Sequence, residues 1–209
     1  MKHKTTILTS LACLIPLLLG VILYNKLPES IATHFNSEGI ADDYSSKNFT
    51  VFILPLIFLM VNLFVSFMIN NDPKKANVSQ KMKNLLLWLI PVLSNIVMST
   101  TFGIAMGIKL DITTIVFSMV GILFTVLGII LPKLKRNYTI GIKLPWTLND
   151  DYNWEKTHSL AGKIWIIGGI ILFINGIFNM GASITVLVII LLILIPTIYS
   201  YLIFKNPNN

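Results

Sequence analysis

The residue types that most often bind metals or act as nucleophiles are few in this sequence. It has three histidines, His3, His34 and His158, and one cysteine, Cys13. A zinc site needs about four such ligands brought together. In the topology derived below, His34 lies on the opposite side of a membrane from the other two histidines, so we predict no metal site. Cys13 has no partner for an intrachain disulfide, and we expect it to be a small buried apolar residue.

Catalysis or ion transport inside a membrane usually needs ionisable groups there. The long apolar stretches of the sequence contain no Asp, Glu, Lys or Arg in their interior. They also contain no H-E-x-x-H sequence, no pair of aspartates and no G-x-S-x-G sequence, which disfavours intramembrane proteases and carboxylate-based proton pumps. We therefore expect a protein that is not an enzyme and has no cofactor.

Uncharged polar residues do occur within the apolar stretches. We expect them to hydrogen-bond between helices, and the alternative is that they line a polar transport path. The sequence also contains Gly103 and Gly107 in a G-x-x-x-G pattern, which is typical of close helix packing. The polar residues concerned are Asn62, Ser66, Ser94, Asn95, Ser99, Thr100, Thr101, Ser118, Thr125, Asn175 and Asn179.

The elements that position these residues are predicted to be six transmembrane helices. Of all residues 55% are hydrophobic and only 12% are charged, which is typical of an integral membrane protein. Each apolar block is about as long as the ~20 residues that cross a bilayer, and none alternates as a barrel strand would. The last block is about twice that length and is broken at residues 179–183, so we count it as two spans. The blocks are 7–24, 49–69, 84–108, 112–132 and 164–204.

The basic residues predict the orientation of these helices. Of the 16 lysines and arginines, only Lys26, Lys47 and Lys109 fall on one side of the predicted membrane. The rest share the other side with both termini, which the positive-inside rule places in the cytoplasm. The net charge of +7 is therefore a topology signal, with some attraction to anionic membrane lipid, and we expect no direct binding of nucleic acid.

The chain is expected to be all-α, polytopic and divided into three helical hairpins. Residues 1–70 form the first with an external loop, residues 71–132 the second, and residues 133–209 a cytoplasmic segment followed by the third. In the cytoplasmic segment, Thr147 and Asp150 resemble a capping box that begins a helix. Trp154, His158, Ala161 and Trp165 then recur at helical spacing on one face.

The tryptophans of this segment have two possible roles. Trp146, Trp154 and Trp165 suit the membrane interface, where the indole N–H stays hydrated while the ring lies in lipid. The alternative is that they form a docking surface for a cytoplasmic protein.

The external loop contains a specific motif. The sequence L-P-E-S-I-A-T-H-F-N begins at Leu27 and is followed by Gly39. It resembles the L-P-x-x-I-x-x-H-[FW]-x-x-x-G motif of a bacterial membrane domain of unknown function. We expect this loop to contact an extracellular peptide, or else to cover the ends of the helices. The candidate residues are Pro28, Ile31, His34, Phe35 and Gly39.

The cytoplasmic segment contains a second, longer motif. It reads G-I-K-L-P-W-T-L from Gly141, and a tryptophan, a T-H pair and a glycine follow. This resembles the signature of the SdpI family, the immunity proteins against the sporulation-delaying-protein toxin. Lys143 stands where arginine is usual, so the charge is kept but the planar bidentate fork is lost. The residues matched are Gly141, Lys143, Pro145, Trp146, Thr147, Trp154, His158 and Gly162.

The resemblance implies a six-helix protein of the bacterial cytoplasmic membrane. The founding member of that family protects its producer from a secreted antimicrobial peptide and also holds its own repressor at the membrane when toxin is present. The partners implied here are membrane lipid, a secreted peptide toxin outside and a small winged-helix repressor inside. Two alternatives remain: a small transporter or exporter of a peptide or amphiphile, and an envelope scaffold or membrane enzyme with loop-borne chemistry.

Overall fold

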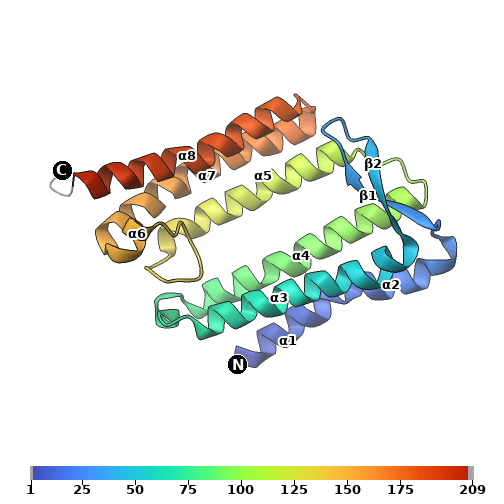
Figure 1. Ribbon diagram of the computed structural model, residues 1–209, viewed down its shortest axis with the longest axis horizontal. Coiled ribbons are helices and arrows are strands. Elements are labelled where there is room, and N and C mark those ends of the chain that lie inside the picture. Colours follow the sequence, from blue (N-terminus) through green and yellow to red (C-terminus); the bar gives the residue numbers. More distant parts are fainter. Residues whose placement is uncertain (1, 207–209) are drawn as a thin grey trace. The chain divides into compact units, whose positions relative to one another are not determined.

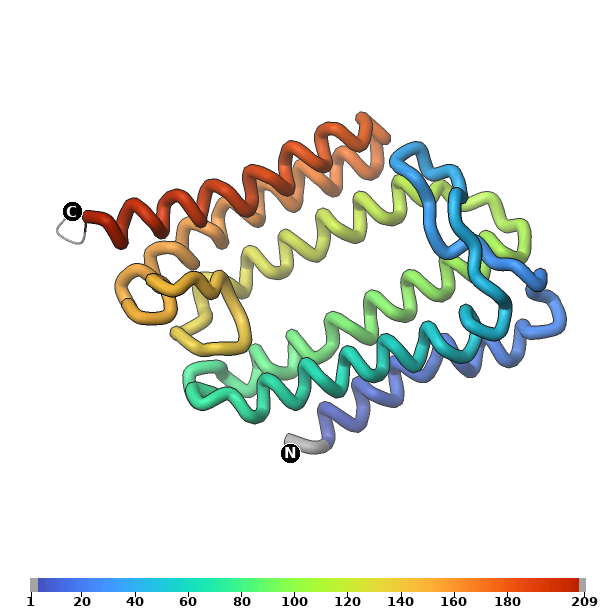
Figure 2. The backbone as a smooth tube through the Cα atoms, in the orientation of Figure 1, coloured from blue at the N-terminus to red at the C-terminus, as the bar shows by residue number. Residues whose placement is uncertain are grey.

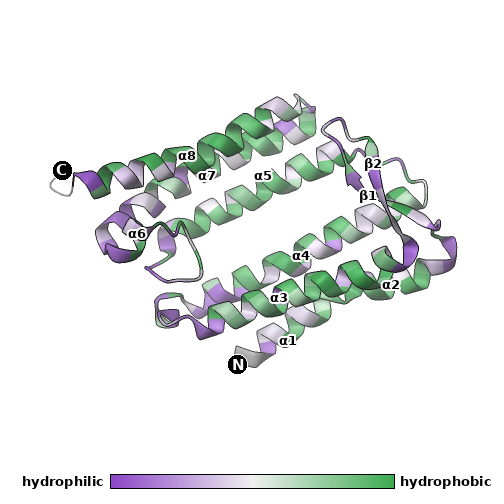
Figure 3. Cartoon of the chain, viewed as in Figure 1, coloured by the Kyte–Doolittle hydropathy of each residue, from purple (hydrophilic) through white to green (hydrophobic). Residues whose placement is uncertain are grey.

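The computed structural model describes the backbone of residues 2–206 and the side chains of residues 4–206. Six of its helices are long and apolar enough to cross a membrane, which confirms the predicted number of spans. Figure 3 shows that these helices are apolar along most of their length, while polar residues gather in the strands and in the segment around α6. The spans are Lys4–Lys26, Phe49–Asn71, Gln80–Ala105, Ile112–Lys133, Asp151–Phe178 and Ala182–Lys205.

Contacts within the chain divide it into two compact units. The first contains the chain up to Asn71 together with Gln80–Ile112, and the second contains Asp72–Ser79 and the chain from Thr113 on. Each unit therefore has its own packing, and the two are described separately below. The division of the chain into three hairpin domains stays a prediction.

The first unit consists of helices α1 to α4 and a β-hairpin (Figure 1). The first span is made of two helical pieces and a short 3-10 turn, and the second begins with a π-helical turn at Phe49–Ile53. Pro91 lies inside the longest helix of this unit. The elements are α1 (Lys2–Cys13), α2 (Ile15–Leu23), β1 (Ser30–Phe35), β2 (Ala41–Ser46), α3 (Leu54–Asn71) and α4 (Gln80–Ala105).

The chain forms a β-hairpin where its turn-forming residues predicted only a loop. Strands β1 and β2 pair antiparallel, and the chain between α2 and α3 folds back on itself there (Figure 2). The Asn36 side chain accepts from the backbone N–H groups of Glu38 and Ile40, and Gly39 takes a positive φ of 78°. The loop predicted to be external is therefore an ordered two-stranded sheet with a tight, side-chain-stabilised turn.

The hairpin is fixed to the helices of its unit through an apolar cluster. Ile31 from β1 is 1% exposed and packs with Leu27, Val51, Met98 and Phe102. Since a two-stranded sheet alone is marginally stable in water, this contact with α4 and the start of the second span is what orders it.

Polar side chains inside the first unit form hydrogen bonds between helices, as predicted. Asn62 on α3 donates to Thr9 and Ser10 of α1 at 3.2 and 3.4 Å. Asn95 on α4 donates to the Ala12 carbonyl at 2.9 Å. These bonds link three helices, which supports the packing role of the polar residues over a transport path.

The second unit contains the C-terminal helices and the polar segments at one of their ends. Helix α7 runs unbroken from the polar segment into the fifth span, as expected. Asn179 in the left-handed conformation and Gly181 at φ 118° form the tight turn between the last two helices. The elements are a 3-10 turn at Lys75–Asn77, α5 (Ile112–Ile130), a 3-10 turn at Leu131–Lys133, α6 (Pro145–Asn149), α7 (Asp151–Phe178) and α8 (Ala182–Lys205).

Helices α5 and α7 pack through glycines. A Cβ atom on Gly128 would lie 2.7 Å from the Ile166 nitrogen and 2.8 Å from the Gly162 oxygen. A Cβ atom on Gly169 would lie 2.6 Å from the Thr125 nitrogen and 2.7 Å from the Gly121 oxygen. The two backbones are therefore in direct contact, which only small residues allow.

The G-x-x-x-G pattern at Gly103 and Gly107 does not have this role, and that prediction was wrong. Gly107 has a φ of 83°, and no atom lies within 4 Å of the position that a Cβ atom would take there. The Ile108 N–H bonds back to the Gly103 carbonyl at 3.0 Å. Gly107 thus ends α4 in the left-handed conformation that helix C-termini favour.

Candidate functional site

The cytoplasmic motif begins with a short helix that is separate from α7. The Thr147 hydroxyl donates to the carbonyls of Ile142 and Leu144 and accepts from the Leu144 N–H at 2.9 Å. Thr147 therefore closes the first turn of α6 and does not cap α7, so that prediction was wrong. The cap of α7 is Asp150, whose carboxylate accepts from the Tyr152 N–H at 2.9 Å.

Trp154 and His158 form the buried centre of the motif. Their rings stack with centroids 4.0 Å apart, and the two residues are 2% and 1% exposed. The indole N–H of Trp154 donates to the Leu134 carbonyl at 2.7 Å. The helical face predicted from their spacing is confirmed, but these two side chains lie inside the fold and offer no surface to a partner.

The hydrogen bonds of His158 define which ring nitrogen carries the proton. Nε2 accepts from the Ile142 N–H at 2.9 Å, so it bears no hydrogen. Nδ1 lies 2.7 Å from the Trp154 carbonyl oxygen, to which it donates. His158 is therefore a neutral imidazole that joins the 137–144 segment to α7.

Gly141 is required for this arrangement. It has a φ of 116°, and a Cβ atom there would lie 2.4 Å from Nε2 of His158. Any other residue would both strain the backbone and displace the imidazole. The other motif glycine, Gly162, lies in the α5–α7 contact, where a Cβ atom would be 2.4 Å from Pro132.

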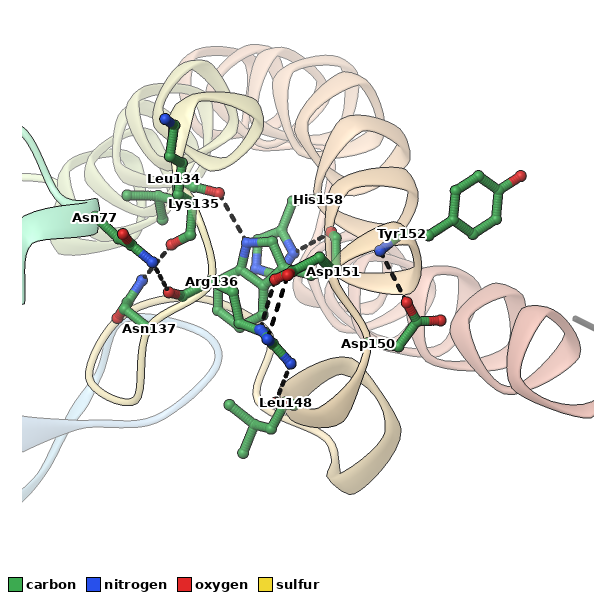
Figure 4. Close-up of polar contacts among 11 residues, drawn as sticks. Asn77, Leu134, Lys135, Arg136, Asn137, Leu148, Asp150, Asp151, Tyr152 and His158 are labelled. Carbon is green, nitrogen blue, oxygen red and sulfur yellow. Dashed lines mark hydrogen bonds and ion pairs between the residues drawn. The ribbon is translucent and has the colours of Figure 1, made fainter. Parts of the chain in front are cut away.

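Arg136 connects the start of the segment to its end (Figure 4). Its Nε lies 2.6 Å from one carboxylate oxygen of Asp151, Nη2 donates to the other at 3.3 Å, and Nη1 donates to the Leu148 carbonyl at 2.9 Å. The Arg136 carbonyl in turn accepts from the side chain of Asn77 at 2.7 Å. One arginine thereby holds α6, α7 and the 72–79 connection together.

Two further polar side chains order the 137–144 segment. Asp72 is 4% exposed and accepts from the N–H of Tyr138 at 2.9 Å and from the hydroxyl of Thr139 at 2.6 Å. Asn137 is fully buried and accepts from the N–H groups of Thr139 and Ile140. Buried polar groups that are satisfied in this way fix a loop to one conformation.

A pocket of about 500 Å³ opens beside the Arg136–Asp151 pair. Its lining contains both basic and acidic residues. The residues that line it are Asn77, Pro132, Lys133, Leu134, Lys135, Arg136, Asp151, Trp154 and Glu155.

The motif also forms hydrogen bonds and a ring contact with α8. The indole N–H of Trp146 donates to the Ser200 hydroxyl at 2.7 Å, and its ring stacks on Phe204 with centroids 5.7 Å apart. Asn153 donates to the Ser200 carbonyl at 2.8 Å. Trp165 donates its N–H to the Leu192 carbonyl at 2.9 Å. All three tryptophan N–H groups expected to remain hydrated are thus bound to protein acceptors, and that prediction was wrong.

The exposed members of the cytoplasmic motif are Lys143 and Pro145. Of its other six residues, Thr147, Trp154, His158 and Gly162 are buried, and Gly141 and Trp146 are half-buried. Most of the motif therefore has a structural role, and only Lys143 and Pro145, at the start of α6, present exposed side chains.

The external motif divides in the same way. Ile31 is buried and Phe35 is half-buried, whereas Pro28 and His34 are exposed. Nδ1 of His34 lies 2.6 Å from the Asp42 carboxylate on the opposite strand. Gly39 forms the turn. The exposed part of the hairpin therefore combines an imidazole with carboxylates.

Lys47 is a buried side chain that stabilises the hairpin and that sequence reasoning did not single out. It is 8% exposed, and its ammonium donates to the Leu27 carbonyl at 3.2 Å and pairs with Glu29 at 2.7 Å. The acids without such a basic partner remain at the tip and on β2: Glu38 and Asp43, both exposed. The hairpin therefore presents net negative charge.

Residues suited to metal binding do not gather anywhere in the described part of the chain. Among the residues whose placement the structure describes, no three His, Cys, Asp or Glu side chains are grouped as metal ligands. Cys13 is buried, as expected of a small apolar residue.

Comparisons with known proteins cover nearly the whole chain. Residues 133–200 match the SdpI/YfhL protein family, and residues 11–59 match a domain of unknown function, DUF1648. The chain is 30% identical over 209 residues to "Immunity protein SdpI" of Bacillus subtilis (strain 168), a match that covers 98% of each protein. No solved structure matches the chain.

Proposed function

Because the chain belongs to the SdpI/YfhL protein family, we propose that it is an immunity protein that protects a bacterium against a secreted peptide toxin. It is a multi-pass protein of the bacterial cytoplasmic membrane. The observation that carries the proposal is the similarity over 98% of both chains to a protein named for immunity. We further propose that the chain acts by binding and not by catalysis, since the residues of its two motifs mainly pack and hydrogen-bond within the described part of the chain.

The exposed hairpin is the proposed contact with the toxin. It carries the carboxylates of Glu38, Asp42 and Asp43 beside the exposed apolar side chains of Ile40 and Tyr44, which are 59% and 56% exposed. A peptide that attacks a membrane and is recognised here would need cationic and apolar groups, because opposite charges steer association and apolar contact supplies affinity.

We predict that His34→Ala lowers protection of a toxin-sensitive bacterium about tenfold in the toxin concentration that halves growth. The imidazole is exposed and pairs with Asp42, so its loss alters the binding surface without opening the core. Ser37→Ala, at the exposed turn of the same hairpin, is the matched control and should protect like the parent. Unchanged protection by His34→Ala at equal membrane abundance would make the hairpin a purely structural cover.

We propose that both termini lie in the cytoplasm, as the distribution of lysines and arginines predicts. Reporter fusions at Lys75, Lys143 and the C-terminus should then be active only in the cytoplasm. Fusions at Glu38 and Lys109 should be active only outside. An external C-terminus would place the two motifs on the wrong sides and contradict the assignment of the hairpin to toxin contact.

The cytoplasmic motif is the proposed site for a winged-helix repressor. Its exposed residues Lys143 and Pro145, at the start of α6, are the accessible part, and the exposed Lys143 ammonium could pair with an acidic group of a partner. Lys143→Ala should reduce membrane recruitment of such a repressor in the presence of toxin and leave survival under toxin unchanged. Equal loss of both would assign Lys143 to the fold alone.

A further inference from the structure

The pocket beside Arg136 lies where a membrane span ends. The fourth span runs to Lys133, and both Pro132 and Lys133 line the pocket. Its apolar lining residues are Pro132, which is exposed, and Leu134 and Trp154, which are buried. A cavity at this depth is at the boundary between hydrocarbon and the polar headgroup layer, which extends several ångströms beyond each end of a span.

The charges that line the pocket are not all neutralised within the protein. Arg136 is paired with Asp151 at 2.6 Å. Lys133 and Lys135 are exposed, and within the described part of the chain the structure records no ion pair for either. Figure 4 shows the Lys135 ammonium extending away from the Arg136–Asp151 pair. Two exposed lysines without a recorded ion pair therefore line the pocket, together with the exposed Glu155, and their long side chains can turn toward a bound anion.

We propose that this pocket binds the phosphodiester headgroup of a membrane lipid. Lys133 and Lys135 would hold the phosphate oxygens, because ammonium groups are common phosphate ligands. Glu155 accepts a hydrogen bond from the hydroxyl or ammonium group of the headgroup alcohol. The exposed Pro132, at the end of the span, would contact the glycerol backbone and the start of the acyl chains. A volume of about 500 Å³ suits a group of this size.

A soluble phosphate ester offers the same charged group without the acyl chains. The lipid is favoured because two lining residues, Pro132 and Lys133, belong to the end of the fourth span, where lipid headgroups lie. The two sources differ in one measurable way, since only the lipid gains affinity from apolar contact.

The test is native mass spectrometry of the purified full chain in detergent. It is titrated with phosphatidylglycerol in one arm and with soluble glycerol phosphate in the other. The variant K133Q/K135Q should bind phosphatidylglycerol at least about tenfold more weakly than the parent, because each lysine near an anionic headgroup adds to affinity. K163Q, at an exposed lysine of α7 outside the pocket, should bind like the parent. K133R/K135R, which keeps both charges, should restore binding.

Equal lipid binding by K133Q/K135Q and the parent would overturn the proposal. Loss of binding in K133R/K135R as well would also overturn it, since that pattern indicates a damaged fold and not a lost charge. Binding of glycerol phosphate as tight as that of the lipid would overturn the assignment to lipid and identify a soluble phosphate ester as the ligand.

Discussion

Gly128→Ala should lower the free energy of unfolding by about 3 kcal/mol or more, one of the largest losses that a single added methyl group can cause in this chain. Overpacking of a close-packed contact costs ~1–3 kcal/mol when side chains can move. Here the added Cβ would lie 2.7 Å and 2.8 Å from backbone atoms of α7, which cannot move without separating the two helices. The measurement is the midpoint of thermal unfolding of the purified protein in detergent.

Gly103→Ala is the matched control for that substitution. It is also a helical glycine, but its added Cβ would meet the side chains of Leu110 at 3.2 Å and Ile108 at 3.7 Å, which can adjust. Alanine is favoured over glycine within a helix by roughly 1 kcal/mol, so this variant should be as stable as the parent or slightly more stable. Equal stability of Gly128→Ala and Gly103→Ala would refute the backbone contact between α5 and α7.

Gly141→Ala is the second substitution with a large expected effect. A positive φ such as that of Gly141 costs a non-glycine residue ~1–2 kcal/mol of backbone strain. The new Cβ would also displace the His158 ring, 2.4 Å away, and so break its hydrogen bond with the Ile142 N–H, for a further ~1–3 kcal/mol. We expect a total loss of about 3–4 kcal/mol and faster proteolysis of the 137–144 segment.

Gly181→Ala separates the two contributions. Gly181 has a φ of 118°, close to the 116° of Gly141, but no atom lies within 4 Å of its Cβ position. It should therefore show only the ~1–2 kcal/mol of backbone strain. If both variants lose the same stability, the contact between Gly141 and His158 has no energetic role.

The helices were predictable because the membrane imposes a simple pattern. Charged residues mark where each span ends, and continuous apolar runs of the right length have no alternative to a helix. Asn62 and Asn95 were also predictable as links between helices, because an amide within a span must find a partner. The helical face of Trp154 and His158 followed from their spacing alone.

The hairpin was harder to predict because its strands carry little apolar alternation. Strand β2 reads A-D-D-Y-S-S and is largely exposed, so the period of two that marks a half-buried strand is weak. The available signal was Asn36 followed by Gly39 between two segments that contain Thr33 and Tyr44, residues favoured in strands. The buried position of Ile31 depends on contacts with helices that are distant in sequence.

The interactions of the cytoplasmic segment could not be derived from one sequence. Asp72 and Thr139 are 67 residues apart, and Asn77 and Arg136 are 59 apart, so no local rule joins them. The glycine contacts did leave a signal, since Gly162, Gly169 and Gly176 recur every seven residues, as do Gly121 and Gly128. The more familiar pattern at Gly103 and Gly107 marks the end of a helix.

Protection of living cells tests the central claim most directly. A toxin-sensitive bacterium would carry either this gene or an empty vector, and the measured quantity is the toxin concentration that halves growth. We expect cells with the protein to need a concentration at least about tenfold higher. Superimposable inhibition curves, with the protein confirmed in the membrane fraction, would contradict its assignment as an immunity protein against that toxin.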